Sequence, residues 1–376
     1  MKNIHTYSLF LLTLFFAVSA VAETVVDITG AGAAKKSVAI DVSNRAFANC
    51  LKRNLELSGL FAVQPNGGIK VSGAPGAISV TGGGKSLSST TPASDDKSAR
   101  MAARKLSDAM CEAYGQQKGF ACDRVVFVNR KGANNAELCM SYPDGLDIRQ
   151  LTADATGTVG PRWMGANTIL YTSLKSGPQI WEYDVAAEKR RMKWSFKGLT
   201  TGAAVSPDGK RVAIILSFQG NPELYVIEGN SYTRLTNTKN ASEGCPAWSP
   251  DGKKIVYMSD ETRSQQLWII DVATKAKRRL TSKGRQNMEP DWGKDGRIVY
   301  NSSGVIKVID PAEGEGSARA ITKDGGWKHP SWARDGRHVV AASGKVLFVL
   351  DTMEDGDAPR GVFNAKGNWG DPCWAK

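Results

Sequence analysis

One short phrase recurs six times along the C-terminal part of this chain, and it constrains the fold more than any other feature. Its copies are Pro161-Arg162-Trp163, Ala203-Ala204-Val205, Pro246-Ala247-Trp248, Pro290-Asp291-Trp292, Pro330-Ser331-Trp332 and Pro372-Cys373-Trp374. The last residues of successive copies lie 42, 43, 44, 40 and 42 positions apart. Repeats of this length are typical of propellers and other repeat arrays. Because one repeat is too small to bury its own apolar faces, the six copies must pack on one another.

Each repeat predicts four short β-strands. The phrase forms the first strand, and in four copies it leads into an Asp-Gly turn such as Ser206-Pro207-Asp208-Gly209. Aspartate bonds to its own backbone in such a turn, and glycine adopts the positive φ that closes it. Two β-branched runs follow, as in Lys254–Ser259 and Gln266–Asp271, and a weaker run ends in Leu-Thr or Ile-Thr. Since one propeller blade has four strands in about 40–45 residues, residues 122–376 are predicted to form an all-β, six-bladed propeller.

The two ends of the propeller region are expected to meet in one blade. The first β-run, Arg124–Asn129, has no copy of the phrase before it, and the last copy has no further strands after it. Pairing of Asp371–Ala375 with Arg124–Asn129 would complete a blade and leave no open sheet edge between the ends. We therefore expect the C-terminal strand to close the ring.

Residues 23–121 lack the repeat and are predicted to form a small α/β domain. Apolar stripes at helical spacing predict one helix over about 43–58 and a second over about 97–114. The expected strands are 37–41, 60–64, 69–72 and 78–81. The segment 82–96 is rich in Gly, Ser and Thr, and it is predicted to be a loop.

Residues 1–22 have the pattern of a secretory signal peptide. Lys2 supplies the positive start, Leu9–Val18 is the apolar stretch, and Ala20-Val21-Ala22 is a cleavage site. Cleavage there predicts an exported protein that begins at Glu23. No later segment approaches 18 consecutive apolar residues, so no transmembrane segment is expected after cleavage.

The charge balance favours acidic partners. The chain has 49 Lys and Arg residues against 37 Asp and Glu residues, which gives a formal net charge of +12. A basic protein attracts acidic partners or an anionic envelope surface. No run of five basic residues occurs, so nucleic acid is not predicted as a partner.

Six cysteines raise the question of disulfides, which an exported chain permits. Cys122 precedes the first propeller strand and Cys373 lies in the closing strand, so a Cys122–Cys373 bridge would link the two ends of the ring. Pairing of Cys111 with Cys122 is the alternative. The chain has no CxxC motif and only two histidines after signal cleavage, so neither a metal site nor a cofactor is predicted.

The segments just before each repeated Pro are the candidate binding sites, because all six converge at one end of the central channel. Exposed Trp and charged residues on converging loops suit a rim that binds another protein. The candidates are Glu243, Arg285, Asn287, Glu289, Trp327, Lys328, His329, Trp369 and Asp371. In contrast, Trp248, Trp292 and Trp332 are expected to pack between blades.

An exported chain with a small α/β domain and a propeller of Pro-x-Trp-Ser-Pro-Asp-Gly repeats resembles the TolB family. The segment Leu55-Glu56-Leu57-Ser58-Gly59-Leu60-Phe61 also looks like the family's first helix and following strand. The resemblance implies a periplasmic, non-catalytic scaffold of the Tol-Pal system, which maintains the outer membrane and helps it constrict at cell division.

The resemblance also implies partners. TolB-like proteins bind the peptidoglycan-associated lipoprotein Pal through the propeller rim, where Glu289 stands in the place of the family's acidic residue before Pro. Their N-terminal tail binds the inner-membrane protein TolA, and the start of the mature chain, Glu23, Thr24, Val25 and Val26, resembles that tail. We expect a monomer without a cofactor.

Two other classes of function compete with the scaffold. A peptidase or lyase propeller needs a nucleophile and a base, but the chain has no G-x-S-x-G motif and only His329 and His338 to serve as bases. A propeller that binds glycans or small ligands could use Trp327 and Trp369, and it remains the alternative to the scaffold.

Overall fold

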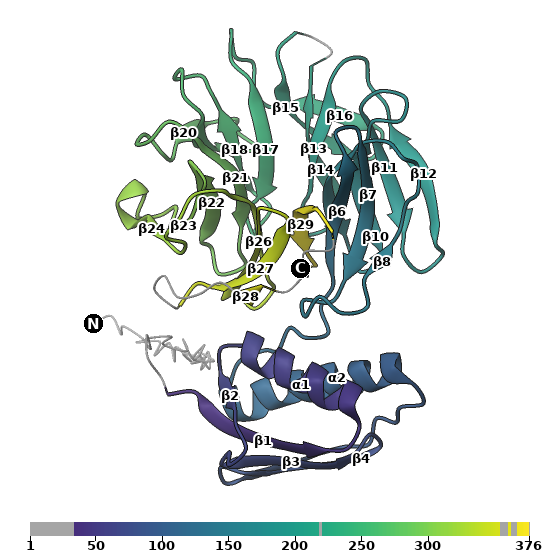
Figure 1. Ribbon diagram of the computed structural model, residues 1–376. Coiled ribbons are helices and arrows are strands. Elements are labelled where there is room, and N and C mark those ends of the chain that lie inside the picture. Colours follow the sequence, from purple (N-terminus) through teal and green to yellow (C-terminus); the bar gives the residue numbers. More distant parts are fainter. Residues whose placement is uncertain (1–33, 218–219, 354–359, 362–366, 376) are drawn as a thin grey trace, which may run out of the picture.

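The protein has a small α/β domain and a six-bladed propeller (Figure 1). The computed structural model describes residues 34–217, 220–353, 360–361 and 367–375. The predicted signal peptide and the tail residues Glu23, Thr24, Val25 and Val26 lie outside the described residues. Within the described ranges, no helix combines the length and the apolar character that a membrane span requires.

The small domain is a five-stranded sheet with two helices on one face. Its elements are β1 (Lys36–Val42), α1 (Arg45–Leu57), β2 (Phe61–Val63), β3 (Ile69–Ala74), β4 (Ala77–Gly82), β5 (Lys85–Ser89) and α2 (Asp96–Gly115). The strand order is β2-β1-β3-β4-β5, with β1 parallel to both of its neighbours and the other pairs antiparallel. Figure 1 shows both helices between this sheet and the propeller.

Both predicted helices are confirmed, and each begins at a capping residue. The side chain of Asn44 accepts a hydrogen bond from Phe47 N at 2.9 Å. Asp95 and Ser98 form a reciprocal capping box at the start of α2. The apolar faces of the helices, including Leu51 and Leu106, are buried in one core with the sheet. Burial of these faces is what holds the helices on the sheet.

The prediction of a loop over 82–96 is wrong in part, because β5 pairs with β4 along its whole length. Gly82, Gly83 and Gly84 have φ angles of 124°, 58° and 73°, which turn the chain back at no steric cost. Only Leu87 of β5 packs against the core, as a partly buried residue. The strand therefore lacks the apolar alternation that would have marked it in the sequence.

Six four-stranded blades form the propeller, and the strands of each blade are ordered from the channel outwards. Blade 1 is β29 (Trp369–Trp374), β6 (Val125–Gly132), β7 (Asn135–Ser141) and β8 (Arg149–Gln150). Blade 2 is β9 (Thr158–Met164), β10 (Thr168–Ser173), β11 (Gln179–Asp184) and β12 (Lys189–Trp194). Blade 3 is β13 (Thr200–Val205), β14 (Arg211–Leu216), β15 (Glu223–Glu228) and β16 (Ser231–Arg234).

The other three blades follow the same antiparallel order. Blade 4 is β17 (Glu243–Trp248), β18 (Lys254–Ser259), β19 (Gln266–Asp271) and β20 (Lys277–Arg279). Blade 5 is β21 (Asn287–Trp292), β22 (Ile298–Ser302), β23 (Val305–Ile309) and β24 (Arg319–Ala320), with a short 3₁₀ helix at Glu315–Ser317. Blade 6 is β25 (Trp327–Trp332), β26 (His338–Ser343), β27 (Val346–Asp351) and β28 (Arg360–Gly361). The first strand of each blade packs against the first strands of both neighbouring blades, which makes a ring.

The predicted closure of the ring is confirmed. Strand β29 pairs antiparallel with β6, with Trp369 opposite Asn129 and Trp374 opposite Val125. The Trp374 indole donates a hydrogen bond to Asp123 at 3.0 Å, just after the small domain. The beginning of β29 therefore lies at the end of the channel that faces away from the small domain.

All six cysteines are free thiols in the structure, so neither the Cys122–Cys373 bridge nor its Cys111–Cys122 alternative is present. Cys373 packs with Val126 and Trp163 between blades 1 and 2. The backbone N–H of Cys122 instead donates to Asp108 on α2. The two thiols thus belong to different packing environments.

Neighbouring blades are joined by the repeated Trp and by an Arg at the end of the Asp-Gly turn. Trp248, Trp292 and Trp332 are buried, as predicted. The Trp248 indole of blade 4 donates to Ala204 O of blade 3 at 2.9 Å, and the Arg211 guanidinium of blade 3 lies 4.7 Å from the Trp248 ring centroid. Arg297 of blade 5 repeats this contact on Trp332 of blade 6.

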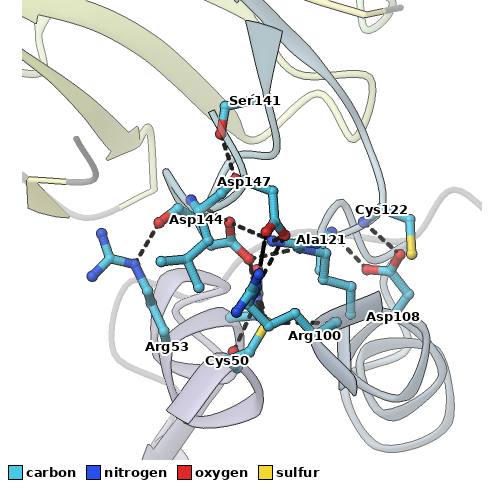
Figure 2. A network of polar contacts seen from close by, with 12 residues as sticks. Cys50, Arg53, Arg100, Asp108, Ala121, Cys122, Ser141, Asp144 and Asp147 are labelled. Carbon is cyan, nitrogen blue, oxygen red and sulfur yellow. Dashed lines mark hydrogen bonds and ion pairs between the residues drawn. The ribbon is translucent and has the colours of Figure 1, made fainter. Parts of the chain in front are cut away.

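A buried ion-pair network connects the small domain to blade 1 (Figure 2). Arg104 on α2 donates to both carboxylate oxygens of Asp144, at 2.8 and 3.1 Å, and to Asp147 at 2.9 Å. The side chains of Arg104 and Asp144 are both 0% exposed. Arg53 on α1 donates to the Asp144 carbonyl at 2.6 Å, and Arg100 also binds Asp147. Both aspartates lie in the loop between β7 and β8, so this loop fixes the two helices to the propeller.

We expect Asp144→Asn to lower the free energy of unfolding by about 3 kcal/mol, because it leaves Arg104 buried beside a single carboxylate. Urea denaturation followed by circular dichroism measures this effect. Glu188→Gln is the matched control, because it breaks the solvent-exposed Arg149–Glu188 pair and should change stability by less than about 1 kcal/mol. Equal effects of the two substitutions would show that the network does not hold the domains together.

Candidate functional site: the channel ring of the propeller

The innermost strand of every blade is interrupted at the same position by a residue with a left-handed backbone. These residues, which we call the channel ring, are Gly160 (φ 57°), Gly202 (φ 68°), Cys245 (φ 50°), Glu289 (φ 54°), His329 (φ 51°) and Asp371 (φ 47°). Each coincides with a break in the register to the second strand. A non-glycine residue in this region costs of the order of 1 kcal/mol or more, and four of the six are not glycine.

Three residues of the channel ring form a series of contacts in which an imidazole lies between two carboxylates; with Arg130 we call this series the charge chain. His329 Nε2 lies 3.1 Å from Glu289 Oε1, and His329 Nδ1 lies 3.1 Å from Asp371 Oδ1. The His329 backbone N–H also donates to Glu289 Oε2 at 2.6 Å. Beyond His329 in this series of contacts, Arg130 Nη2 donates to Asp371 Oδ1 at 2.7 Å. Three successive blades therefore meet at one imidazole between two carboxylates.

The Asp371 carboxylate is the most constrained member of this chain. Burial alone would raise its pKa, but His329, Arg130 and the Gly160 N–H, which donates at 3.3 Å, together lower the pKa below its ordinary value. Asp371 is therefore ionised at neutral pH. Its charge contributes stability that is present above the ordinary pKa and is lost as the pH falls through the lowered value.

A second layer of polar groups lies two residues further along the innermost strands. Asp291 accepts hydrogen bonds from Trp332 N at 2.8 Å and Ser331 Oγ at 3.2 Å. Burial would lower the pKa of Arg162, but Cys373, Asp291, Cys245 and Asp371 outweigh it and raise the pKa, which keeps the guanidinium charged. Within the described residues, no group of three or more His, Cys, Asp and Glu side chains is arranged to hold a metal ion.

The structure separates the nine predicted rim residues into three groups. Glu289, His329 and Asp371 meet in the channel ring. Arg285 and Lys328 are exposed to solvent. The buried residues are Glu243, Asn287, Trp327 and Trp369, each at the first position of an innermost strand.

The expectation that Trp327 and Trp369 are exposed on loops is wrong. The Trp327 ring packs against Phe348 with centroids 5.1 Å apart, and the Trp369 ring packs against Phe127 at 5.3 Å. Both lie on strands, where side chains alternate between the two sides. At the first strand position both rings pack between blades, and the channel-ring residues stand at the bulge two positions later.

Two acids face each other where blades 3 and 4 meet. Glu223 is 1% exposed and Glu243 is 3% exposed. The Thr238 hydroxyl lies 3.2 Å from Glu223 Oε1 and from both oxygens of Glu243, and Glu223 Oε2 has no hydrogen-bond partner. One hydroxyl can donate to only one of these oxygens at a time. Glu223 Oε1 also accepts from Arg234 at 3.0 Å, and Glu243 Oε1 also accepts from the Ser259 hydroxyl at 3.1 Å. Burial, and then the charge of Glu223, raise the pKa of Glu243 from 4.5 to about 8, so Glu243 is protonated at neutral pH.

Two other blades bury polar groups at the equivalent positions without bringing two acids together. Between blades 4 and 5, the equivalent residues are Gln266 and Asn287, and Asn287 Nδ2 donates to Gln266 Oε1 at 2.8 Å. On β7 of blade 1, Glu137 is a buried acid without a second acid beside it in its hydrogen-bond network. It accepts from the Thr152 hydroxyl and from two backbone N–H groups at 3.2 and 2.7 Å. In the pair between blades 3 and 4, Arg234 compensates the charge of Glu223, whereas Glu243 accepts only from hydroxyl groups and has no cationic partner.

Sequence reasoning missed four residues that shape this site: Arg130, Arg162, Asp291 and Glu223. Asp291 and Arg162 stand at the middle position of the repeated phrase, where other copies have Ala, Ser or Cys. A charged residue at a position where the other copies have a small residue could have marked Asp291 and Arg162 as candidates for the site. Arg130 and Glu223 carried no such signal, because their roles depend on contacts between different strands.

We expect Glu243→Gln to stabilise the protein above pH 7. The folded-state pKa of about 8 lies above the ordinary 4.5, so Glu243 contributes stability that is fully present below pH 4.5 and is lost as the pH rises through 8. Wild type should lose on the order of 2 kcal/mol relative to the variant between pH 6 and pH 9, measured by urea unfolding.

Glu137→Gln is the control for this substitution. It removes an acid whose oxygens already have N–H and O–H donors, so it should destabilise the protein at every pH in that range. A wild-type stability that runs parallel to that of Glu243→Gln from pH 6 to pH 9 would show that Glu243 does not hold a proton.

Comparison with known proteins agrees with this architecture. Residues 111–376 match the family described as the TolB beta propeller domain. The chain is 29% identical over 157 residues to the Tol-Pal system protein TolB of Anaeromyxobacter dehalogenans strain 2CP-C, and the alignment covers 40% of this chain and 36% of that protein. It thus spans little more than a third of that relative.

Solved structures show how widely the fold occurs. The crystal structure of TolB from Acinetobacter baumannii aligns with a TM-score of 0.76 at 23% identity, over 91% of this chain and 97% of that chain. A nidogen/laminin complex aligns with a TM-score of 0.55 at 10% identity, over 68% of this chain and 98% of the matched chain. At these identities the alignments establish the fold alone. Because the matching family covers residues 111–376, more than half of the chain, the protein belongs to the TolB β-propeller family.

Proposed function

We propose that this protein is a non-catalytic scaffold of a Tol-Pal system in the periplasm, where it binds a Pal-like, peptidoglycan-associated lipoprotein at the channel ring. Its role would be to support outer-membrane integrity and cell division. Membership of the TolB propeller family and the partial similarity to a Tol-Pal system protein support the system. The channel ring supports the location of the binding site.

The charge chain from Glu289 through His329 and Asp371 to Arg130 is the observation that carries this proposal. Glu289, His329 and Asp371 keep a strained backbone, although glycine occupies the same position in two other blades. Strain of this kind persists where the surrounding structure fixes it, and it concentrates at functional sites. Glu289 and His329 are only partly buried, so a partner that reaches the channel can contact both. Exposed Arg285 and Lys328 precede them in blades 5 and 6.

The second contact of the proposed scaffold is an inner-membrane, TolA-like protein, which would bind the N-terminal tail at Glu23, Thr24, Val25 and Val26. The tail precedes β1 of the small domain, whose helices are fixed to blade 1 through Arg104 and Asp144. Binding at the tail and binding at the channel ring would therefore act on one connected body.

The arrangement of the described histidines favours binding over catalysis. Both ring nitrogens of His329 face carboxylates, and His338 Nδ1 lies 2.6 Å from Asp335 with its ring packed on Phe120. Both ring nitrogens of His329 are therefore occupied, and the His338 ring is too deeply buried for a substrate to reach it. The alternative of a glycan-binding propeller depended on Trp327 and Trp369, and burial of both rings removes the surface on which a sugar would stack.

A pull-down with the mature chain, residues 23–376, from detergent-solubilised envelopes of the native host tests the proposal. Wild type should retain a peptidoglycan-associated lipoprotein that mass spectrometry identifies. Glu289→Gln combined with His329→Gln removes the ion pairs of the channel ring and should lower retention roughly tenfold, as expected for a binding hot spot.

Two checks make the result specific. The double variant must keep a cooperative thermal transition, so that lost binding is not lost folding. Glu261→Gln combined with Lys277→Gln, which removes an ion pair on the outer side of blade 4, should leave retention unchanged. Retention of the lipoprotein by the channel-ring variant at the wild-type level would place the binding site elsewhere. Recovery of no envelope protein by wild type would contradict the scaffold.

A further inference from the structure

Strand β12 is an unusually long outer edge for this propeller. It has six residues, whereas the outer strands of the other blades cover two to four in the described part of the chain. One side of β12 pairs with β11, and β12 is the last strand of its sheet. Figure 1 shows it at the periphery of the ring, far from the innermost strands. In an antiparallel strand, alternate residues direct their N–H and C=O groups to the unpaired side.

The side chains of β12 make this edge strongly basic. Lys189, Arg190, Arg191 and Lys193 give four positive charges in six residues. Arg191 and Lys193 share a single acid, Glu182 of β11, and Arg190 pairs with Asp154. Two acids against four bases leave an excess of positive charge. Arg191 keeps 77% of its side chain exposed even with this pairing.

The edge also exposes apolar surface. Met192 is 47% exposed and lies between Arg191 and Lys193, opposite Trp181 of β11. Lys193 lies over the ring of Trp194, at 5.1 Å from its centroid. A flexible thioether next to an aromatic ring can adapt to the side chains of an incoming strand.

We propose that β12 is a docking edge for an acidic, extended peptide segment of another protein, which adds to blade 2 as a fifth antiparallel or parallel strand. Backbone hydrogen bonds to the open side of β12 would supply affinity, and the basic side chains would select acidic residues. A second copy of this chain does not fit, because pairing of two β12 edges sets Lys and Arg against Lys and Arg. This docking edge is separate from the channel ring and does not depend on the function proposed there.

A seven-residue peptide that alternates glutamate with valine, acetylated and amidated at its ends and fluorescently labelled, tests the proposal. Fluorescence anisotropy with the full chain at low salt should show saturable binding that weakens as salt rises. The same peptide with every backbone N–H methylated should lose binding, because methylation removes the backbone donors, whereas a contact made by charge alone would be unchanged. Hydrogen exchange of the backbone N–H groups of β12 should slow only with the unmethylated peptide.

A pair of matched variants separates the edge from general basicity. Lys189→Glu with Arg191→Gln should weaken peptide binding roughly five- to tenfold, as expected for lost contacts between solvent-exposed charges. Lys275→Glu with Arg279→Gln makes the same change of charge around β20, the three-residue outer strand of blade 4, and should leave binding unchanged.

Three results would overturn the docking edge. The first is equal binding of the methylated and unmethylated peptides. The second is equal weakening by the β12 and β20 variants. The third is binding of phosphatidylglycerol vesicles without binding of the peptide, which would make the surface a membrane contact instead.

Discussion

The antiparallel pairing of β29 with β6 joins residues at opposite ends of the propeller, and every contact around the ring relies on it. The strand completes blade 1 and thereby gives blade 6 and blade 2 a neighbour to pack against. It also carries Asp371, whose carboxylate connects Arg130 of blade 1 with His329 of blade 6. Closure of the fold and assembly of the channel ring are therefore one event, because the charge chain exists only when the last strand is in place.

Carboxylates in three parts of the molecule differ in their burial and in the donors around them. The Arg104–Asp144 pair is buried, and two guanidinium nitrogens donate to the carboxylate, so it fixes the small domain to blade 1. Glu243 is buried beside Glu223 with hydroxyl donors alone, so it takes up a proton at neutral pH. In the channel ring, Asp371 is buried and paired, whereas Glu289 and His329 are only partly buried. These three outcomes follow from burial and from the number of donors near each carboxylate.

The repeated phrase was sufficient to predict the six blades, their strands and the closing pair, because repeat spacing and turn chemistry are local properties of the sequence. It also placed Glu289, His329 and Asp371 correctly as neighbours at one end of the channel. It could not predict that Trp327 and Trp369 are buried, because the bulge that separates them from the channel is visible only in the register between strands. The sequence also did not predict β5, because its serines show no apolar alternation. The roles of Arg130 and Glu223 could not be predicted because they depend on contacts between strands.

The central claim is that the channel ring is the surface that a peptidoglycan-associated lipoprotein contacts. Hydrogen–deuterium exchange of the full chain, alone and saturated with that lipoprotein purified from the native host, tests this claim most directly. Exchange should slow in the segments that lead into β21, β25 and β29, where Glu289, His329 and Asp371 lie. Slowing confined to the small domain or to the outer strands, or unchanged exchange at saturation, would contradict it.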